Sequence, residues 1–393
     1  MPEAEKDSPR LPLAGVRVLE FCQVAAGPFC GMLLADMGAD VIKIESEAGD
    51  SMRQWPPFNN GYSENFASVN RSKRSVTLDL KSESGRAAAL RLAETADIVI
   101  ENNRPGVMKR LGLDFETLSR IRPALVYGSI SAFGQSGPRA AQGGFDLTIQ
   151  GVSGIMSVTG EAGGAPVKCG VPISDFCAGL YAAYAIAAML PEARRTGRGA
   201  HIDVPMIGTS LGVAALQTSQ YFGTGADPEK LGSAHPRNAP YQAFKAQDGY
   251  FVMAAGNNKL WQSVCEALNR PDLFANPDYE TTVLRAANQV ALKEALEAQF
   301  ATREVADLLA LFSARGIPCG PINSYSEALA DPQVAHFGWV RALSLPGGGE
   351  TRTFASPITI SGHAAPDPRQ PPALGEHNDE ILRELQSQRE AGE

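Results

Sequence analysis

Residues 16–45, VRVLEFCQVAAGPFCGMLLADMGADVIKIE, decide the fold class of this chain. The apolar run VRVLEF at 16–21 predicts a buried strand. Residues 28–37 have the spacing of a helix that ends at Gly38, glycine being the residue favoured just past a helix. The second apolar run, at 41–45, predicts another strand. A strand, a helix and a strand in so short a segment are typical of a parallel sheet covered by helices.

The alternation continues beyond this segment. Further strands are predicted at 76–80, 97–101 and 125–131, with helices at 84–96 and 115–121. We therefore predict an α/β fold, with a Rossmann-like large domain built on a mostly parallel sheet and a smaller α/β domain. The predicted boundaries are 10–222 for the large domain, 223–240 for a linker rich in Gly, Pro and polar residues, 241–330 for the small domain, and 331–390 for a segment that returns to complete the large domain.

A glycine-rich stretch at 134–170 interrupts the alternation. It predicts turns and a backbone that approaches a ligand closely. An apolar helix is predicted after it, at 175–190. In the small domain we expect a strand pair at 241–255 around Asp248-Gly249. The remaining predictions are helices at 259–268, 290–301, 305–315 and 376–386, strands within 350–361, and a turn at the triple glycine 347–349.

The composition excludes several classes of protein. With 44% hydrophobic and 20% charged residues in 393, it is typical of a soluble globular protein. The longest apolar run is shorter than the roughly 20 residues of a membrane span, and the charged N-terminus lacks a signal region. We therefore expect a cytoplasmic protein without a membrane partner. The net charge of −8 disfavours nucleic acid as a partner. Because the Cys and His residues lack ligand spacing, we expect no metal.

The common catalytic motifs are absent from the sequence. No G-x-G-x-x-G follows a predicted strand, so the dinucleotide fingerprint is missing. The P-loop, H-E-x-x-H and G-x-S-x-G patterns do not occur either. The sequence therefore gives no support to an NTPase, a metalloprotease or a serine hydrolase.

Asp175 is the first candidate for a functional residue, because it heads the apolar helix predicted at 175–190. A helix that is apolar on all sides is buried, and its N-terminus carries partial positive charge and free N–H groups. We expect a carboxylate there to stay ionised and, in a dry site, to act as a nucleophile. The alternative is that Asp175 or Ser174 only caps the helix, since both residue types are favoured at caps.

Basic residues near predicted strand ends are the second candidate feature. In open parallel sheets the ligand binds outside the carboxyl ends of the strands, and Arg104 and Arg110 follow the strand at 97–101 closely. They are suited to binding phosphate. Solvated surface charge is the alternative for each of them. The basic residues concerned are Lys73, Arg74, Lys81, Arg104, Lys109 and Arg110.

Segments along nearly the whole chain, taken together and in order, resemble the family III (CaiB/BaiF-type) CoA-transferases. They include LAGVRVLEF at 13–21, NRSKRSVTLDLK at 70–81, ADIVIENNRPGVMKRLGL at 96–113, GGFDLTIQGVSGIMSVTG at 143–160, VPISDFCAGLYAA at 171–183, GRGAHIDVPM at 197–206, GIPCGPINS at 316–324 and LGEHNDEIL at 374–382.

The resemblance implies that Asp175 is the catalytic nucleophile and that CoA or acyl-CoA binds as a substrate, with no tightly bound cofactor. It also implies an interlocked homodimer. Two positions depart from the family pattern: Asn103 stands where many members have an aromatic residue, and Ser46 where some have a basic one. The CoA contacts that the resemblance implies are Gln23, Val24, Ala25, Ala26, Leu78, Lys81, Asn102, Arg104, Arg110, Gly144 and Phe145.

A sister branch of this family, the 2-methylacyl-CoA racemases, is the main alternative. Its members pair the aspartate with a histidine in a G-H-D motif, which reads Gly144-Phe145-Asp146 here. A racemase needs two acid–base groups, one on each face of the reacting carbon. Because Phe145 occupies the histidine position, we predict CoA transfer. Asp146 is expected either to orient a loop or to cap a turn.

The resemblance implies transfer through an anhydride and an aspartyl-CoA thioester on Asp175, with water excluded. Backbone N–H groups at Gly143 and Gly144 are candidate oxyanion donors. The segment at 231–258 resembles the dicarboxylate CoA-transferases that use succinate and hydroxymethylglutarate. We therefore expect succinyl-CoA or a similar donor, and a dicarboxylate acceptor held by His235 and Arg237. Formate/oxalate- or carnitine-type transfer is an alternative, and a simple linker turn is the alternative role for His235 and Arg237.

Overall fold

The computed structural model describes residues 11–364 and 366–392, except for the side chains of 388–392, and it divides the chain into two compact units. The first unit holds the described residues of Met1–Ile155, Lys168–Thr224 and Pro332–Glu393. The second holds Met156–Val167 and Gly225–Asp331. Most of the segment predicted as a linker thus lies within the second unit. Residues 156–167 of the glycine-rich stretch also belong to the second unit. In it, the Lys230 ammonium donates to the carbonyls of Gly164 and Ala165.

The first unit is built on a six-stranded sheet, in the described part of the chain, with the order β5-β2-β1-β6-β7-β8. All neighbouring strands are parallel, which confirms the predicted α/β fold. The chain winds outward from β1 in one direction and then from β6 in the other, so the switch point of the topology lies between these two strands. The strands are β1 (Arg17–Phe21), β2 (Asp40–Glu45), β5 (Arg74–Thr77), β6 (Ile98–Glu101), β7 (Val126–Ser131) and β8 (Ala200–Pro205).

Alternating side chains of the strands form two apolar layers, one on each side of the sheet. In β1, Val18 belongs to one layer and Leu19 to the other. Helices α1 (Ala26–Asp36) and α8 (Ile173–Thr196) supply residues to the first layer. Helices α3 (Glu83–Glu94), α5 (Phe115–Ile121) and α18 (Asn378–Gly392) supply residues to the second. The sheet is therefore covered on both faces, as parallel sheets require.

Helix α8 is longer than the sequence predicts. It begins at Ile173, continues through Pro191 and ends at Thr196, where Gly197 caps it with a φ of 70°. The predicted end at 190 is wrong, because a proline removes only one backbone hydrogen bond while the glycine stop lies further on. By length and composition α8 could cross a membrane, but core helices pass the same test. Ala178, Ala182 and Ile186 are fully buried in the first apolar layer.

The regions with the weakest sequence patterns hold elements that the sequence does not predict. The glycine-rich stretch contains α6 (Asp146–Val152) and α7 (Ile155–Val158), and α9 (Met206–Val213) and α10 (Ala215–Thr224) follow β8. Residues 355–361 are not a strand, so that part of the 350–361 prediction is wrong. The hairpin is β12 (Val340–Leu345) and β13 (Gly349–Phe354), joined at Gly347 and Gly348, which have positive φ. The first unit also contains η2 (Ser51–Gln54), β3 (Phe58–Asn59), β4 (Tyr62–Ser63), α2 (Glu64–Asn70), α4 (Val107–Leu111) and α17 (Pro332–Phe337).

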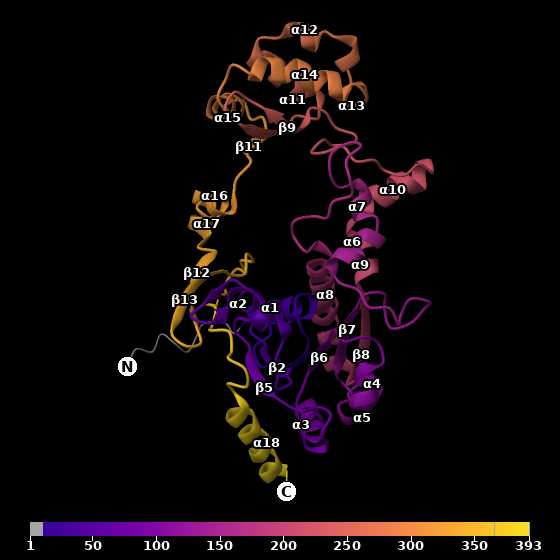
Figure 1. Cartoon of the computed structure of the whole chain (residues 1–393), viewed down its shortest axis with the longest axis vertical. Helices are drawn as coiled ribbons and strands as arrows, with labels where there is room; N and C mark the ends of the chain where they lie inside the picture. The colour runs from indigo at the N-terminus through magenta and orange to yellow at the C-terminus, as the bar shows by residue number, and fades with distance from the viewer. Residues whose placement is uncertain (1–10, 365, 393) are drawn as a thin grey trace. The chain divides into compact units, whose positions relative to one another are not determined.

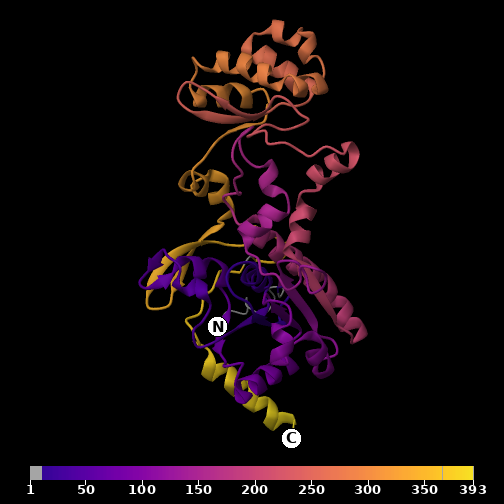
Figure 2. The same cartoon turned by 45° about the vertical axis from the view of Figure 1, so that its right-hand side comes forward.

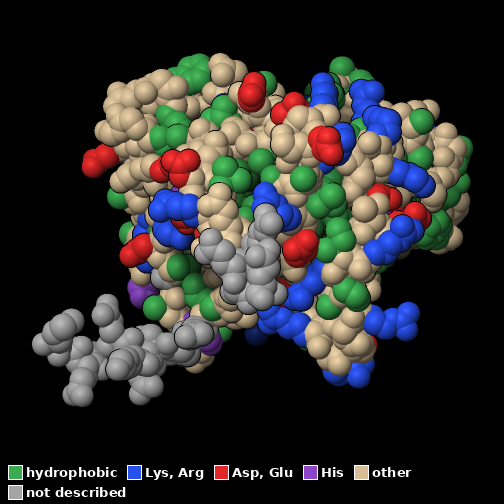
Figure 3. Space-filling model, turned by 90° about the horizontal axis from the view of Figure 1, so that it is seen from below, with side chains coloured by type: hydrophobic (Ala, Val, Ile, Leu, Met, Phe, Trp, Pro, Cys, Tyr) green, Lys and Arg blue, Asp and Glu red, His purple; other side chains and the backbone are tan. Residues whose placement is uncertain are grey.

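The C-terminal helix α18 is attached to the first unit by charges and by buried side chains. Arg74 forms ion pairs with Glu380 at 2.8 Å and Glu384 at 2.6 Å, and Ile381 is fully buried in the second apolar layer. Figures 1 and 2 both show α18, in yellow, at the end of the chain. The face seen in Figure 3 carries Lys and Arg side chains among Asp and Glu side chains, so both signs of charge are present there.

The second unit has its own sheet and its own core. β9 (Tyr241–Lys245), β10 (Tyr250–Ala254) and β11 (Cys319–Pro321) form an antiparallel sheet, which confirms the predicted strand pair. Phe244, Phe251, Phe300 and Phe312 are fully buried and pack ring against ring. The helices are α11 (Asn258–Leu268), α12 (Pro271–Phe274), η3 (Pro277–Tyr279), α13 (Thr282–Ala287), α14 (Gln289–Phe300), α15 (Val305–Ser313) and α16 (Tyr325–Leu329).

Candidate active site

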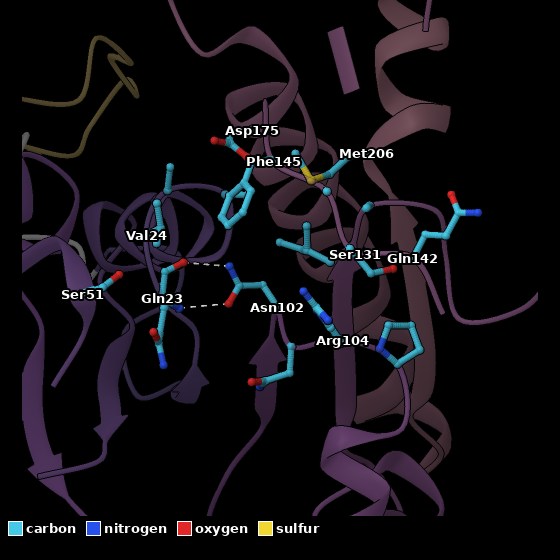
Figure 4. Close-up of a pocket in the computed structure, with 18 residues that line it drawn as sticks. Gln23, Val24, Ser51, Asn102, Arg104, Ser131, Gln142, Phe145, Asp175 and Met206 are labelled. Atoms are coloured by element: carbon cyan, nitrogen blue, oxygen red, sulfur yellow. Dashed lines mark hydrogen bonds between the residues drawn. The ribbon is translucent and has the colours of Figure 1, made fainter. Parts of the chain in front are cut away.

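A pocket of about 350 Å³, the first or switch-point pocket, lies at the carboxyl ends of β1, β6 and β7. This is the position where open α/β sheets bind their ligands. Figure 4 shows Asp175, Phe145 and Met206 in the upper part of the view, and Gln23 and Asn102 near its centre. The described residues that line it are Gln23, Val24, Ala25, Ala26, Ser51, Asn102, Asn103, Arg104, Pro105, Ile130, Ser131, Ala132, Gln142, Gly143, Gly144, Phe145, Asp175 and Met206. The fold therefore brings the predicted nucleophile and eight of the predicted CoA contacts to one pocket.

Gln23 and Asn102 join the two strands at the switch point. Gln23 follows β1, and its backbone N–H donates to the Asn102 side-chain oxygen at 2.9 Å. The Asn102 side-chain nitrogen donates to the Gln23 carbonyl at 2.8 Å, so the amide makes two hydrogen bonds to one residue (Figure 4). This pair fixes the distance between the ends of β1 and β6, where the pocket opens.

A second pocket of about 480 Å³ shares Gln23 and Asn103 with the first. Leu78, Lys81 and Arg110, the remaining predicted CoA contacts, line this second pocket. Ser46 also lines it, so the position where some family members have a basic residue does face the pocket. The Asn103 side chain donates to the Phe21 carbonyl at 3.1 Å, which turns its amide toward the backbone.

Asp175 is the third residue of α8, and its side chain is partly buried. The capping alternative is wrong for Asp175, because the N-cap position is held by Pro172. The Asp146 carboxylate instead accepts the backbone N–H of Ser174 at 2.9 Å. Among the described residues, no hydrogen bond or ion pair involves the Asp175 carboxylate, so it faces the pocket with its oxygens available.

Asp146 orients the loop that leads into α8, which decides between the two roles predicted for it. Its second carboxylate oxygen accepts from the Gln150 side chain at 2.7 Å, and the Gln150 oxygen accepts the N–H of Cys169 at 2.8 Å. Gln150 is fully buried. Gln150 was not predicted from the sequence, although its spacing of four residues from Asp146 would place both on one helix face.

The pKa of Asp175 is raised from 3.8 to about 7, first by burial and then by the negative charge of Asp146. We expected the helix terminus to keep this carboxylate ionised, and that expectation is wrong in direction. The terminus favours the charged form, but burial and a neighbouring carboxylate outweigh it. A carboxylate with this pKa is half ionised near neutral pH and more basic than an ordinary aspartate.

The glycines beside Phe145 form a tightly packed wall of the pocket. A Cβ at Gly144 would lie 2.9 Å from the Cβ of Ala132, and one at Gly143 would lie 2.9 Å from the Arg104 side chain. Phe145 itself is 73% exposed. The backbone at 143–145 therefore runs along the pocket surface. Gly144 has no room for a Cβ, whereas the flexible end of the Arg104 side chain would have to move to admit one at Gly143.

His235 and Arg237 lie in the second unit, and neither lines the two pockets described above. The Nδ1 atom of His235 accepts the backbone N–H groups of Arg237 and Asn238, both at 3.1 Å. Burial and the charge of Arg237 lower the pKa of His235, which favours the neutral ring. His235 thus stabilises a turn through one nitrogen, and its part in binding an acid stays a prediction.

Comparison with known proteins identifies the class to which this fold and site belong. Residues 13–378 match the family model described as CoA-transferase family III. The chain belongs to this family and is a CoA-transferase, as the resemblance predicted.

Three similar proteins cover nearly the whole chain. The succinate–glutarate CoA-transferase of Agrobacterium fabrum is 40% identical over 96% of this chain and 96% of its own length. The succinyl-CoA:glutarate CoA-transferase of Mus musculus is 39% identical over 98% of this chain and 88% of its own. The crystal structure of a CaiB/BaiF family protein from Brucella suis has a TM-score of 0.86 and 39% identity, covering 96% of this chain and 100% of that one.

Proposed function

We propose that this enzyme moves CoA between dicarboxylic acids and that Asp175 is its covalent nucleophile. One observation carries the proposal. Asp175 is the one carboxyl group among the described residues lining the switch-point pocket, and its pKa is raised to about 7 by burial and by Asp146. The names of the two relatives pair succinate with glutarate, and both acids are dicarboxylates.

The reaction proceeds through two kinds of covalent intermediate on Asp175. The carboxylate attacks the donor thioester carbonyl, the C–S bond breaks, and CoA leaves as a thiolate, so that a mixed anhydride of Asp175 and the donor acid is formed. The thiolate attacks the aspartyl carbonyl, which forms an aspartyl-CoA thioester and releases the donor acid. The acceptor carboxylate then attacks this thioester, and the expelled thiolate attacks the acceptor carbonyl of the new anhydride. Acyl-CoA leaves and the Asp175 carboxylate is restored.

The two pockets divide the work of binding the CoA ester. Lys81 and Arg110 in the second pocket are suited to the phosphate groups of CoA. The thioester reaches Asp175 in the first pocket by passing Gln23 and Asn103, which line both. Val24, Ile130, Phe145 and Met206 supply apolar surface beside the nucleophile. Apolar walls slow hydrolysis of the anhydride and the thioester by keeping water away.

Racemase activity is the alternative that the site disfavours. The described residues lining the first pocket include no His, Cys, Lys or Tyr that could exchange a proton opposite Asp175. Asp146 is engaged by Ser174 and Gln150. Deuterium from solvent should therefore not enter the α-position of a 2-methylacyl-CoA, and wash-in at turnover rates would favour the racemase.

An acceptor panel tests the proposed function. Succinyl-CoA is incubated with glutarate, hydroxymethylglutarate, oxalate, formate and carnitine, and each new CoA ester is measured by mass spectrometry. We expect the dicarboxylates of glutarate type to have the highest kcat/KM. If formate, oxalate or carnitine is preferred, the dicarboxylate assignment fails and the alternative acceptor replaces it.

Asp175→Asn tests the nucleophile within the same assay. The matched control is Asp307→Asn, because Asp307 also lies in the first turn of a helix but is exposed in the second unit. We expect a loss of at least about 10³-fold for Asp175→Asn, since covalent catalysis would be abolished, and full activity for Asp307→Asn. Full turnover by Asp175→Asn would contradict the mechanism.

We also propose that the protein is a cytoplasmic homodimer. Large apolar side chains stand exposed on α8 and α10, among them Tyr184 at 74%, Leu216 at 59% and Phe222 at 81%. Exposed apolar surface of this kind marks interaction sites, and the family resemblance implies a second copy as the partner. Light scattering after size exclusion tests this directly. A monomer at micromolar concentration would contradict it.

A further inference from the structure

Val24 has a backbone conformation that a valine rarely adopts. Its φ is +64°, in the left-handed region, where the Cβ of a branched residue is crowded against the backbone. Val24 lies between Gln23 and Ala25, and all three line the switch-point pocket. Such a conformation persists only where the surroundings hold it in place.

Asp50 makes the contacts that hold this turn. Both of its carboxylate oxygens accept the Val24 N–H, at 3.1 and 3.2 Å. The same carboxylate accepts the N–H of Met52 at 3.0 Å and caps η2. Asp50 is buried, while Ser51 beside it lines the pocket. One carboxylate therefore fixes two segments of the pocket wall.

A row of buried charges of alternating sign extends behind Asp50. Lys43 lies 3.0 Å from Asp50 and 3.0 Å from Glu20, and Lys73 lies 2.7 Å from the other oxygen of Glu20. All four side chains are fully buried. Burial by itself would lower the pKa of Lys43, but the carboxylates of Glu20 and Asp50 outweigh it and raise that pKa. The row holds two positive and two negative groups, so their charges cancel.

The row forms hydrogen bonds to the backbone on both sides of Gln23. Lys43 donates to the carbonyl of Cys22 at 2.8 Å, and Asp50 accepts the N–H of Val24. Buried ion pairs contribute little net stability, and apolar residues often replace them without loss. Their directed contacts to one strained turn indicate a geometric role instead.

We propose that the row Lys73–Glu20–Lys43–Asp50 is a positioning device that holds the turn at 22–24, and that Asp50 and Lys43 are positioning residues for the reaction at Asp175. The turn sets where Gln23 stands, and through Gln23 it sets the bridge to Asn102. The inference rests on the proposed function only in taking this pocket as the site of CoA transfer.

Weakening the contacts of Asp50 tests the proposal. A glycine at position 24, which adopts a positive φ without crowding, distinguishes a positioning role of Asp50 from a general structural one. Asp50→Asn loses the charge that faces Lys43 and weakens the hold on Val24. Val24→Gly relieves the crowding at positive φ, whereas Val24→Ala shortens the side chain and keeps the crowding. Each Val24 variant is made with and without Asp50→Asn, and kcat and KM for succinyl-CoA are measured for all.

We expect Asp50→Asn to lower kcat/KM about tenfold or more, the scale of one strained residue. The same change should cost less than about threefold in the Val24→Gly background and the full amount in the Val24→Ala background. Equal losses in all backgrounds, or no loss in any, would overturn the proposal. If Asp50→Asn alone does not fold, folding restored by Val24→Gly but not by Val24→Ala supports it, and restoration by neither overturns it.

Amide hydrogen exchange provides a readout that does not depend on the reaction. The N–H of Val24 should exchange faster in Asp50→Asn than in the wild type, whether or not the protein transfers CoA. Unchanged exchange at Val24 would show that Asp50 does not hold the turn. Absence of CoA transfer by the wild type would instead contradict the proposed function alone.

Discussion

Asp175 combines two properties that a nucleophilic carboxylate needs, a free face toward the pocket and a raised pKa. The ionised form is the nucleophile, so protonation below the pKa removes activity. We expect kcat/KM to rise with pH through about 7 and to level off above it. A pH profile of the free enzyme from mildly acidic to mildly alkaline conditions measures this, and a profile that is flat across that range would contradict it.

Replacing Asp146 with Asn separates the two causes of the raised pKa. Its charge is the second cause, after burial, so Asp146→Asn should lower the Asp175 pKa and move the profile to lower pH. Glu101 also has its pKa raised to about 7 by burial, and Asp146 is not among the causes of that shift. A profile that does not move in Asp146→Asn would therefore assign the titration to Glu101 or another group.

The raised pKa of Asp175 also affects stability, in a definite direction. An unfolded chain ionises Asp175 near 3.8 and the folded protein near 7, so the folded state loses stability as pH rises through this window. We expect Asp175→Asn to be more stable than the wild type above this window, by a margin that shrinks as the pH falls through it. Thermal unfolding at mildly alkaline and mildly acidic pH measures the margin. A variant less stable than the wild type at alkaline pH would contradict this expectation.

At the residue scale, the sequence predicted Asp175 as the candidate nucleophile but not the residues that support the pocket around it. Asp175 was found because it lies at the start of an apolar run and matches the family pattern. Gln150, Lys43 and Asp50 were missed, because their importance arises from contacts between segments far apart in the chain. The direction of the Asp175 pKa shift was wrong for the same reason: neither the depth of burial nor the approach of Asp146 is visible in local sequence.

At the scale of elements, helix α8 packs closely against helix α1 through a glycine. A Cβ at Gly179 would lie 2.7 Å from the carbonyl of Ala26 and 3.0 Å from the Phe29 ring. Gly179→Ala must push α8 away from α1, and with it Asp175. We expect a stability loss of roughly 1–3 kcal/mol, typical of overpacking, and a lower kcat/KM.

Gly223→Ala is the matched control for this change. Gly223 lies in α10, and a Cβ at this position would meet nothing within 4 Å, so alanine should be neutral or slightly stabilising there. Chemical denaturation of the two variants compares them. Equal stability of Gly179→Ala and Gly223→Ala would show that α8 and α1 are not held as closely as described.

Elements with strong periodic patterns were predicted well, and elements within glycine-rich segments were not. The parallel strands β1, β2, β6 and β7 are rich in Val, Ile and other large apolar residues, as buried parallel strands are, so they could be predicted from the sequence. Helices α6 and α7 lie among glycines, which lower helix propensity. In α6 the Gln150 side chain makes a tertiary contact, because its oxygen accepts the N–H of Cys169 at 2.8 Å. Helix propensity does not include contacts of this kind, so the sequence did not predict these two helices.

At the scale of the whole molecule, the last helix of the chain stabilises the sheet built by the first strands. Ile381 of α18 is fully buried in the same apolar layer as Leu19. We expect Ile381→Ala to cost about 2–5 kcal/mol of unfolding free energy, as for other buried aliphatic truncations. The neighbouring Leu382 is 38% exposed, so Leu382→Ala should cost much less. Urea unfolding of both variants measures the difference, and equal losses would contradict the docking of α18.

The sequence predicted the fold class and the family, because apolar periodicity and motif order extend along nearly the whole chain. It did not predict that residues 156–167 belong with residues 225–331, far along the chain. Hydrogen bonds such as that from the Gly232 N–H to the Gly160 carbonyl join these two segments, and no local sequence pattern predicts them.

Mass spectrometry of the enzyme tests the proposed covalent intermediate on Asp175 most directly. The protein is mixed with succinyl-CoA without an acceptor, quenched in acid and digested. We expect the peptide that contains Asp175 to gain the mass of CoA less one water, and this adduct to disappear on adding the acceptor acid and to be absent in Asp175→Asn. CoA transfer at full rate with no adduct on that peptide, or with the adduct on another residue, would contradict the proposed mechanism.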